Sequence, residues 1–172
     1  MTMYDTAFGR VFRNEGGFQN NHRDRGNWTS GKIGVGELKG TKFGLSAMTY
    51  PHLDIISLTL EQAKAIYKRD WWDALNMKSF RPAMQYQMFD AAINHGMFNT
   101  TRILQYAASA KADGIIGPNT RRLVAAKELN DLLLRFLAER LVFMTHVKTW
   151  DRFGKGWARR IAHNLILASD DN

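Results

Sequence analysis

YDTAFGRVFRNEGG, residues 4–17, is the stretch that decides the fold class of this chain. Its apolar side chains recur at the spacing of an amphipathic helix: Tyr4, Phe8, Val11 and Phe12. Glu15 lies four positions beyond Val11 and continues the same stripe. Gly16 and Gly17 follow, and glycine is common just past the last turn of a helix. We therefore expect a helix that ends with a carboxyl group beside two glycines.

Beyond this helix the character of the sequence changes twice. From residue 18 to residue 46 glycine is frequent and no helical period is present, which predicts one or two short β-hairpins. After Pro51 the pattern is helical almost to the end, with a capping box at Thr59 and Gln62 and a helix start at Pro118. The predicted fold class is α+β, mainly helical, with a small N-terminal β-hairpin lobe and a helical C-terminal bundle.

The composition excludes several classes of protein. The chain has 172 residues, 45% of them hydrophobic, as in a globular domain and unlike a disordered or collagen-like chain. It contains no cysteine, so cysteine nucleophiles, thiolate zinc sites and thiol redox motifs are excluded. A net charge of +8 predicts an anionic partner, which could be nucleic acid, an acidic membrane surface or a wall polymer.

The first residues of the sequence do not have the pattern of a targeting segment. The first 15 residues lack an uninterrupted apolar core and a small-residue cleavage site, so no signal peptide is expected. No apolar run approaches the 18 or so residues that a transmembrane helix needs. We expect the protein to be made in the cytoplasm.

Glu15 is the most informative residue. A carboxyl group on a buried stripe has its pKa raised by desolvation, which suits a proton donor at neutral pH. Glycoside hydrolysis combines such a group with a second polar or anionic group near the anomeric carbon, and Asp24 follows nine positions later. The alternative is a helix-end carboxylate paired with Arg10 or Arg13. The spacing alone leaves both interpretations open.

An ordered series of motifs resembles the glycosyl hydrolase 108 family, the lysozyme-like muramidases of phages and bacteria. In the first half the motifs are RNEGGF at 13–18, DRG at 24–26, TKFGLS at 41–46 and LTLEQA at 58–63. The second half is similar to the peptidoglycan-binding module usually joined to that family, through FDAAINHG at 89–96, DGIIGPNT at 113–120 and GWARR at 156–160. The resemblance implies a lysozyme-like fold. It also implies a muramidase region over residues 1–80 and a helical peptidoglycan-binding-like region over 81–172, packed as one compact unit.

The resemblance also implies catalytic roles. Glu15 corresponds to the catalytic acid, Asp24 to the second catalytic residue and Thr41 to the third. Thr29 stands at the usual distance from Asp24 and is the alternative to Thr41, since residues 30–40 look like an insertion that forms a longer β-hairpin. Where the family has a proline and a second glycine after the aspartate, this chain has Arg25 and Asn27.

The implied function is that of a phage endolysin. It would hydrolyse the β-1,4 bond between N-acetylmuramic acid and N-acetylglucosamine, waiting in the host cytoplasm until lysis and then reaching the cell wall. The alternatives are a lytic transglycosylase that uses Glu15 alone and a basic DNA-binding protein. The DNA-binding interpretation leaves Glu15 and the ordered motifs unexplained, so nucleic acid is not an expected partner. We expect a monomer.

Asp90 and Asn94 lie one helical turn apart and His95 follows at the helix end, so these three residues are candidates for contact with the saccharide. The alternatives are loop capping and, for His95, a favourable interaction with the helix dipole. The histidines show neither i, i+4 pairing nor an HExxH motif. No metal or other cofactor is expected.

The segment from residue 148 to residue 163 carries half of the net charge, with five basic residues against one acidic residue. Aromatic residues are interleaved with the basic ones, as in a surface-active helix. Its candidate envelope-interacting residues are Lys155, Trp157, Arg159 and Arg160. We expect them to meet anionic wall polymer or anionic outer-membrane lipid. The alternative is a helix whose apolar stripe packs inward while its cations face water.

Overall fold

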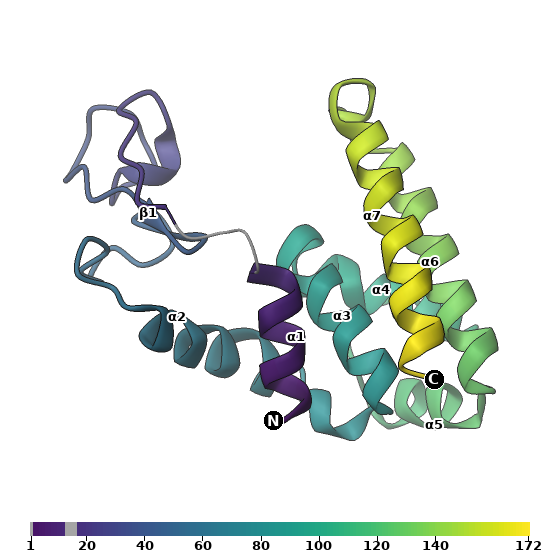
Figure 1. Ribbon diagram of the computed structural model, residues 1–172. Coiled ribbons are helices and arrows are strands. Elements are labelled where there is room, and N and C mark those ends of the chain that lie inside the picture. Colours follow the sequence, from purple (N-terminus) through teal and green to yellow (C-terminus); the bar gives the residue numbers. More distant parts are fainter. Residues whose placement is uncertain (1, 13–16) are drawn as a thin grey trace. The chain divides into compact units, whose positions relative to one another are not determined.

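The computed structural model describes residues 2–12 and 17–172 of the chain (Figure 1). The helices are α1 (Met3–Phe12), α2 (Leu60–Tyr67), α3 (Pro82–His95), α4 (Met97–Ala107), α5 (Pro118–Ala126), α6 (Leu129–Thr145) and α7 (Trp150–Asp170). Two short strands, β1 (Thr41–Lys42) and β2 (Leu45–Ser46), form an antiparallel pair. One π-helical segment, Lys68–Asp73, continues α2, and 3-10 turns occupy Arg25–Asn27 and Met77–Ser79. The predicted fold class, α+β and mainly helical, is confirmed.

The chain forms two compact units. One comprises residues 8–70, and the other comprises residues 71–172 together with the first residues of α1, up to Ala7. The boundary predicted at residue 80 separates two regions that are defined by their resemblance to families. The compact units do not test it, so it stays a prediction.

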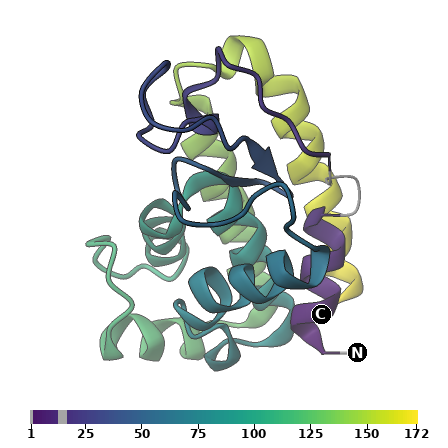
Figure 2. The same ribbon diagram turned by 90° about the vertical axis from the view of Figure 1, so that its left-hand side faces the viewer.

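The unit of residues 8–70 has an aromatic core at one end and loops at the other. The ring of Phe12 lies 4.4 Å from that of Tyr67 and 4.6 Å from that of Phe8, measured between centroids. The strands β1 and β2 are joined by Phe43 and Gly44, whose φ angles are +50° and +75°. Positive φ at both positions is the requirement of a type I′ turn, which closes two-residue hairpins. Figure 2 shows the short strands among these loops.

The predicted longer hairpin over residues 30–40 is replaced by an irregular loop. One isolated antiparallel bridge between Trp28 and Leu38 closes it. Inside the loop the backbone pairs locally, as in the hydrogen bond from the Val35 amide to the Lys32 carbonyl. Gly31, Gly34 and Gly36 have φ between +69° and +78°, which no extended strand can accommodate.

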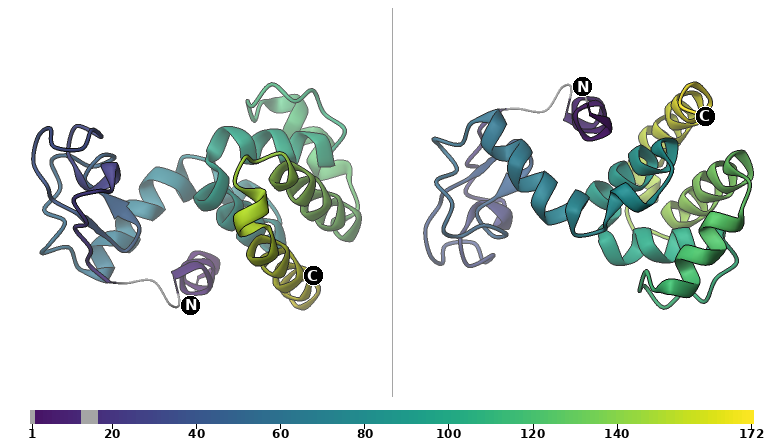
Figure 3. Two further views of the ribbon diagram at one scale, coloured as in Figure 1. Left: turned by 90° about the horizontal axis from the view of Figure 1, so that it is seen from above. Right: turned by 90° about the horizontal axis from the view of Figure 1, so that it is seen from below.

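The unit that contains residues 71–172 is a helical bundle around α3. This helix is buried along its whole middle, and the rings of Tyr4, Trp72 and Phe89 pack edge to face beside it with centroids 5.2–5.8 Å apart. The long helices α6 and α7 run antiparallel side by side (Figures 1 and 3). The predicted capping box at Thr59 and Gln62 and the helix start at Pro118 are both confirmed.

Trp157, Ile161 and Leu165 recur at four-residue steps along α7, but the buried face of this helix differs from that stripe. Ile161 is buried, but 40% of Leu165 is exposed, and Asn164 takes the inward position with 1% exposed. A strict four-residue step drifts around a helix of 3.6 residues per turn, so Leu165 rotates out of the interface. Asn164 is inward because Tyr86, Gln87 and Asp90 all bond to it. None of the helices in the described residues is both long and apolar enough to cross a membrane.

Candidate functional site

Glu15 lies outside the described residues, so its predicted role as the catalytic acid stays a prediction. The structure does describe the other two predicted catalytic residues, Asp24 and Thr41, together with the alternative, Thr29. All three belong to the unit of residues 8–70.

An amide pair joins Asp24 to Thr41. The side chains of Gln19 and Asn27 bond reciprocally, with Gln19 Nε2 donating to Asn27 Oδ1 at 3.0 Å and Asn27 Nδ2 donating to Gln19 Oε1 at 2.8 Å. Thr41 Oγ1 donates to the same Asn27 Oδ1 at 2.7 Å, and Gln19 Nε2 donates to Asp24 Oδ2 at 3.5 Å. We call these four residues the amide hub. In this hub the buried Asn27 side chain holds Thr41 directly, and Gln19 links Asn27 to Asp24.

The direction of the Thr41 hydroxyl follows from this pairing. Asn27 Nδ2 also donates to the carbonyl oxygen of Asn21 at 3.0 Å, and a carbonyl can only accept, so the amide orientation is determined. Asn27 Oδ1 therefore faces Thr41, which must donate its proton there. No hydrogen bond to Thr41 Oγ1 is donated by a residue that the structure describes, so its lone pairs can accept one from a water or a substrate.

Asp24 is held at the start of a short turn. Its Oδ1 accepts from the Gly26 amide at 2.9 Å, which caps the 3-10 turn Arg25–Asn27. The residue is exposed to solvent, so its carboxylate can reach a bound ligand. Backbone hydrogen bonds in both directions between Gln19 and Thr41, at 2.8 and 2.9 Å, fix the chain segments on the two sides of the hub.

The Thr29 side chain makes its hydrogen bond outside this hub. Its Oγ1 accepts from the Glu37 amide at 3.0 Å and closes the irregular loop, and it takes no part in the amide hub. Thr41 therefore lies in the hub and Thr29 does not, while the identity of the third catalytic residue stays a prediction. Sequence reasoning missed Gln19 and Asn27. The available signal was that Asn27 replaces the glycine of the family pattern.

A matched pair of variants tests that choice. We expect Thr41→Val to lower kcat on purified peptidoglycan about 10- to 100-fold, because it removes an acceptor worth about 1–3 kcal/mol while keeping the shape of the side chain. Thr29→Val should keep kcat within about twofold of wild type, since the Thr29 hydroxyl bonds to the Glu37 amide and to no member of the hub. Reducing-end release measures both variants. Equal losses in the two would reject Thr41 as a specific participant.

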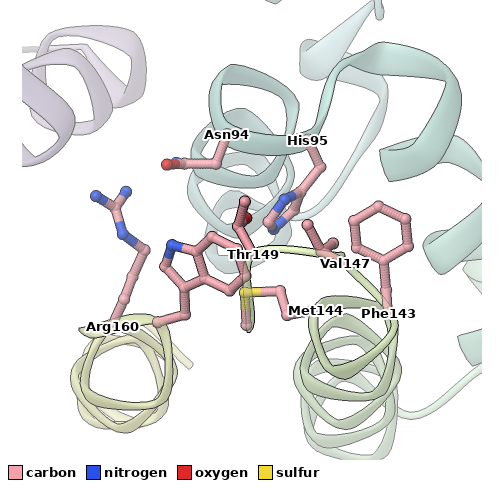
Figure 4. A pocket seen from close by; sticks show the side chains of 8 residues that line it. Asn94, His95, Phe143, Met144, Val147, Thr149 and Arg160 are labelled. Atoms are coloured by element: carbon pink, nitrogen blue, oxygen red, sulfur yellow. The ribbon is translucent and has the colours of Figure 1, made fainter. Parts of the chain in front are cut away.

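The second unit contains a pocket of about 300 Å³ between α3, α6 and α7 (Figure 4). Its polar lining is Asn94, His95, Thr149 and Arg160, and its apolar wall is Phe143, Met144, Val147 and Trp157. In Figure 4 the Asn94 and Arg160 side chains extend into the same side of the pocket. Four residues predicted from separate motifs thus meet here: Asn94, His95, Trp157 and Arg160.

Asp90 is placed behind the pocket, with 2% of the residue exposed. Its carboxylate accepts from Arg140 Nη1 at 2.5 Å, from Asn164 Nδ2 at 2.8 Å and from Arg160 Nη1 at 3.1 Å. Burial alone raises the pKa of Asp90, but the charges of Arg140 and Arg160 outweigh it and hold the pKa below its usual value. The expected saccharide contact is corrected for this residue. Both of its carboxylate oxygens accept hydrogen bonds from side chains of the protein, and these bonds connect α3 to α6 and α7.

His95 is neutral in this environment. Arg140 Nε donates to His95 Nε2 at 2.9 Å, so that ring nitrogen carries no proton. Burial, reinforced by the Arg140 charge, lowers the pKa of His95 to about 4. The helix-dipole alternative, which needs a protonated imidazole, therefore does not apply near neutral pH.

Lys155 and Arg159 point elsewhere. Both are exposed on α7, and neither lines the pocket. Their predicted role at the envelope stays a prediction. Throughout residues 2–12 and 17–172 there is no cluster of three or more His, Asp or Glu side chains suited to a metal ion.

Comparison with known proteins finds a matching family and similar solved structures. The family model described as Glycosyl hydrolase 108 matches residues 8–96, just over half of the chain. Among solved structures, that of Brucella abortus SagA is similar, with a TM-score of 0.79 and 23% identity over 98% of this chain and 94% of that one. At this identity the second match shows a shared fold. No curated protein sequence matches the chain.

Proposed function

The chain belongs to the glycosyl hydrolase 108 family and is therefore a glycoside hydrolase that degrades peptidoglycan, and we propose that it cleaves the β-1,4 bond from N-acetylmuramic acid to N-acetylglucosamine. The observation that carries the finer proposal is the amide hub. It holds a hydroxyl, Thr41, on the buried amide of Asn27, and links it through Gln19 to a solvent-exposed carboxylate, Asp24.

In the proposed mechanism Glu15 donates its proton to the glycosidic oxygen as the bond to the anomeric carbon breaks. A water then needs two acceptors for its protons if a lone pair is to face that carbon. The Asp24 carboxylate and Thr41 Oγ1 supply such a pair. Asp24 takes the proton that the water loses, and the product is the hemiacetal of opposite configuration, as in inverting hydrolases.

The products test this proposal. Digested peptidoglycan should release fragments with reducing N-acetylmuramic acid ends, and in H₂¹⁸O each new end should gain one ¹⁸O atom by mass spectrometry. A lytic transglycosylase adds no water and leaves 1,6-anhydro ends instead. Anhydro ends without ¹⁸O would reject hydrolysis and support the transglycosylase alternative.

We place the reaction in host-cell lysis by a phage, as the resemblance to phage muramidases suggests, with α7 meeting the anionic envelope. Lys155 and Arg159 are exposed on this helix, and 45% of Phe153 is exposed between them and the helix start. Expressed in a bacterial host, the protein should cause lysis only after the inner membrane is permeabilised. The double variant Lys155→Glu and Arg159→Glu should slow that lysis while hydrolysing soluble glycan normally. Unchanged lysis would exclude the envelope role.

A further inference from the structure

Two arginines share one carboxylate beneath the pocket. Asp90 pairs with both Arg140 and Arg160, and no other carboxylate in the described residues pairs with either. His95, which contacts Arg140, is neutral and supplies no negative charge. Among the described residues the cluster therefore has one positive charge without a counter-ion, and part of it faces the pocket because Arg160, whose side chain is 41% exposed, lines it.

The free edge of Arg160 has a specific shape. Its Nη1 donates to Asp90, while Nε and Nη2 have no partner in the described residues. Nε and Nη2 form the side of a guanidinium that binds a carboxylate through two parallel hydrogen bonds. Arg140 is fully buried, and its Nη2 also lacks a hydrogen-bond partner among the described residues. This buried positive charge further favours an anion in the pocket.

The other residues that line the pocket indicate what kind of molecule should carry the anionic group. Phe143, Met144, Val147 and Trp157 form an apolar wall, while Asn94 and Thr149 offer neutral polar groups. A volume of about 300 Å³ fits a fragment of one or two amino acids. A carboxylate attached to small alkyl groups matches this lining better than a neutral, hydroxyl-rich sugar ring does.

We propose that this pocket is a subsite for a free carboxylate of the peptide stem of peptidoglycan, bound by the Nε–Nη2 edge of Arg160 with alanine-sized groups against the apolar wall. The proposal rests on the proposed function, because the substrate polymer supplies the peptide. It assigns the pocket to peptide recognition and leaves the chemistry to the amide hub and Glu15. Peptide-bearing strands are then better substrates than bare glycan.

Binding of small uncleavable ligands to the wild-type protein tests the subsite by calorimetry. Muramyl dipeptide carries one sugar and one free carboxylate, so it contains no scissile β-1,4 bond. We expect it to bind at least about tenfold more tightly than its methyl ester, in line with a charge-assisted bidentate pair. Diacetylchitobiose, which is neutral, should not compete for the pocket.

Variants identify the pocket as the binding site. Arg160→Met should weaken muramyl dipeptide binding at least about tenfold and remove the preference over the ester, whereas Arg122→Met, at an exposed cation of α5 that does not line the pocket, should leave both unchanged. Because Arg160→Met also removes a partner of Asp90, Val147→Trp serves as a second variant that fills the pocket without touching the ion network. Equal affinity for acid and ester, or normal affinity in both variants, overturns the subsite.

The proposed hydrolysis and the proposed peptide subsite can be rejected independently of each other. Hydrolysis is measured as reducing-end release from glycan strands freed of peptide, whereas the subsite is measured by binding alone. Loss of the first with retention of the second rejects the glycosidase mechanism, and the reverse rejects the subsite.

Discussion

Replacing Glu15 by glutamine is expected to reduce the release of reducing ends from purified peptidoglycan by about 100- to 10,000-fold. The amide has nearly the shape of the carboxyl group but cannot give up a proton to the glycosidic oxygen. The leaving sugar would then depart as an alkoxide, and the barrier rises by the whole contribution of general acid catalysis. The effect should fall on kcat, because substrate contacts elsewhere are unchanged.

Glu61→Gln is the matched control. Glu61 is an exposed glutamate in the first turn of α2, and its replacement should leave the rate within about twofold of wild type. Circular dichroism and thermal melting would verify that both variants fold. A Glu15→Gln protein that is folded and retains wild-type turnover would end the assignment of Glu15 as the acid.

Asp90→Asn is expected to be the most destabilising conservative substitution in the second unit, at about 3–5 kcal/mol. Arg140 is fully buried, and its positive charge would lose the only carboxylate that pairs with it in the described residues. The mutant amide keeps the shape but carries no charge. Urea unfolding followed by circular dichroism measures the loss as a lower free energy of unfolding.

Asp131→Asn provides the comparison. Asp131 pairs with Arg135 at 2.8 Å on the surface of α6, with side chains 41% and 55% exposed. Solvent screens such a pair, so its loss should cost less than about 1 kcal/mol. Similar small losses in both variants would contradict the role of Asp90 as the counter-ion of the bundle.

The contribution of Asp90 to the free energy of unfolding depends on pH, and the sign of this dependence follows from its pKa. The pKa of Asp90 is lower in the folded protein than in the unfolded chain, so its contribution to stability is present above the unfolded pKa. It is lost as pH falls through the folded pKa. In Asp90→Asn this acid-side loss should be absent.

Much of the fold follows from local signals. The capping box at Thr59 and Gln62 and the proline at position 118 determine helix starts within three or four residues of sequence, so they could be recognised without a structure. The loop over residues 30–40 could not, because its glycines permit both a hairpin and the observed turns. The outcome depends on backbone pairing across the loop.

The sequence by itself determined the family, the α+β class, most helix positions and the candidate residues Glu15, Asp24 and Thr41. Tertiary structure decided which candidates lie together. The Arg140–Asp90 and Arg160–Asp90 pairs span 50 and 70 residues, and Thr41 reaches Asn27 across 14. Helix signals depend on near neighbours, whereas an ion pair or an amide hub exists only after distant segments have packed. For that reason Asp90 looked like a saccharide contact in the sequence and is a buried counter-ion in the fold.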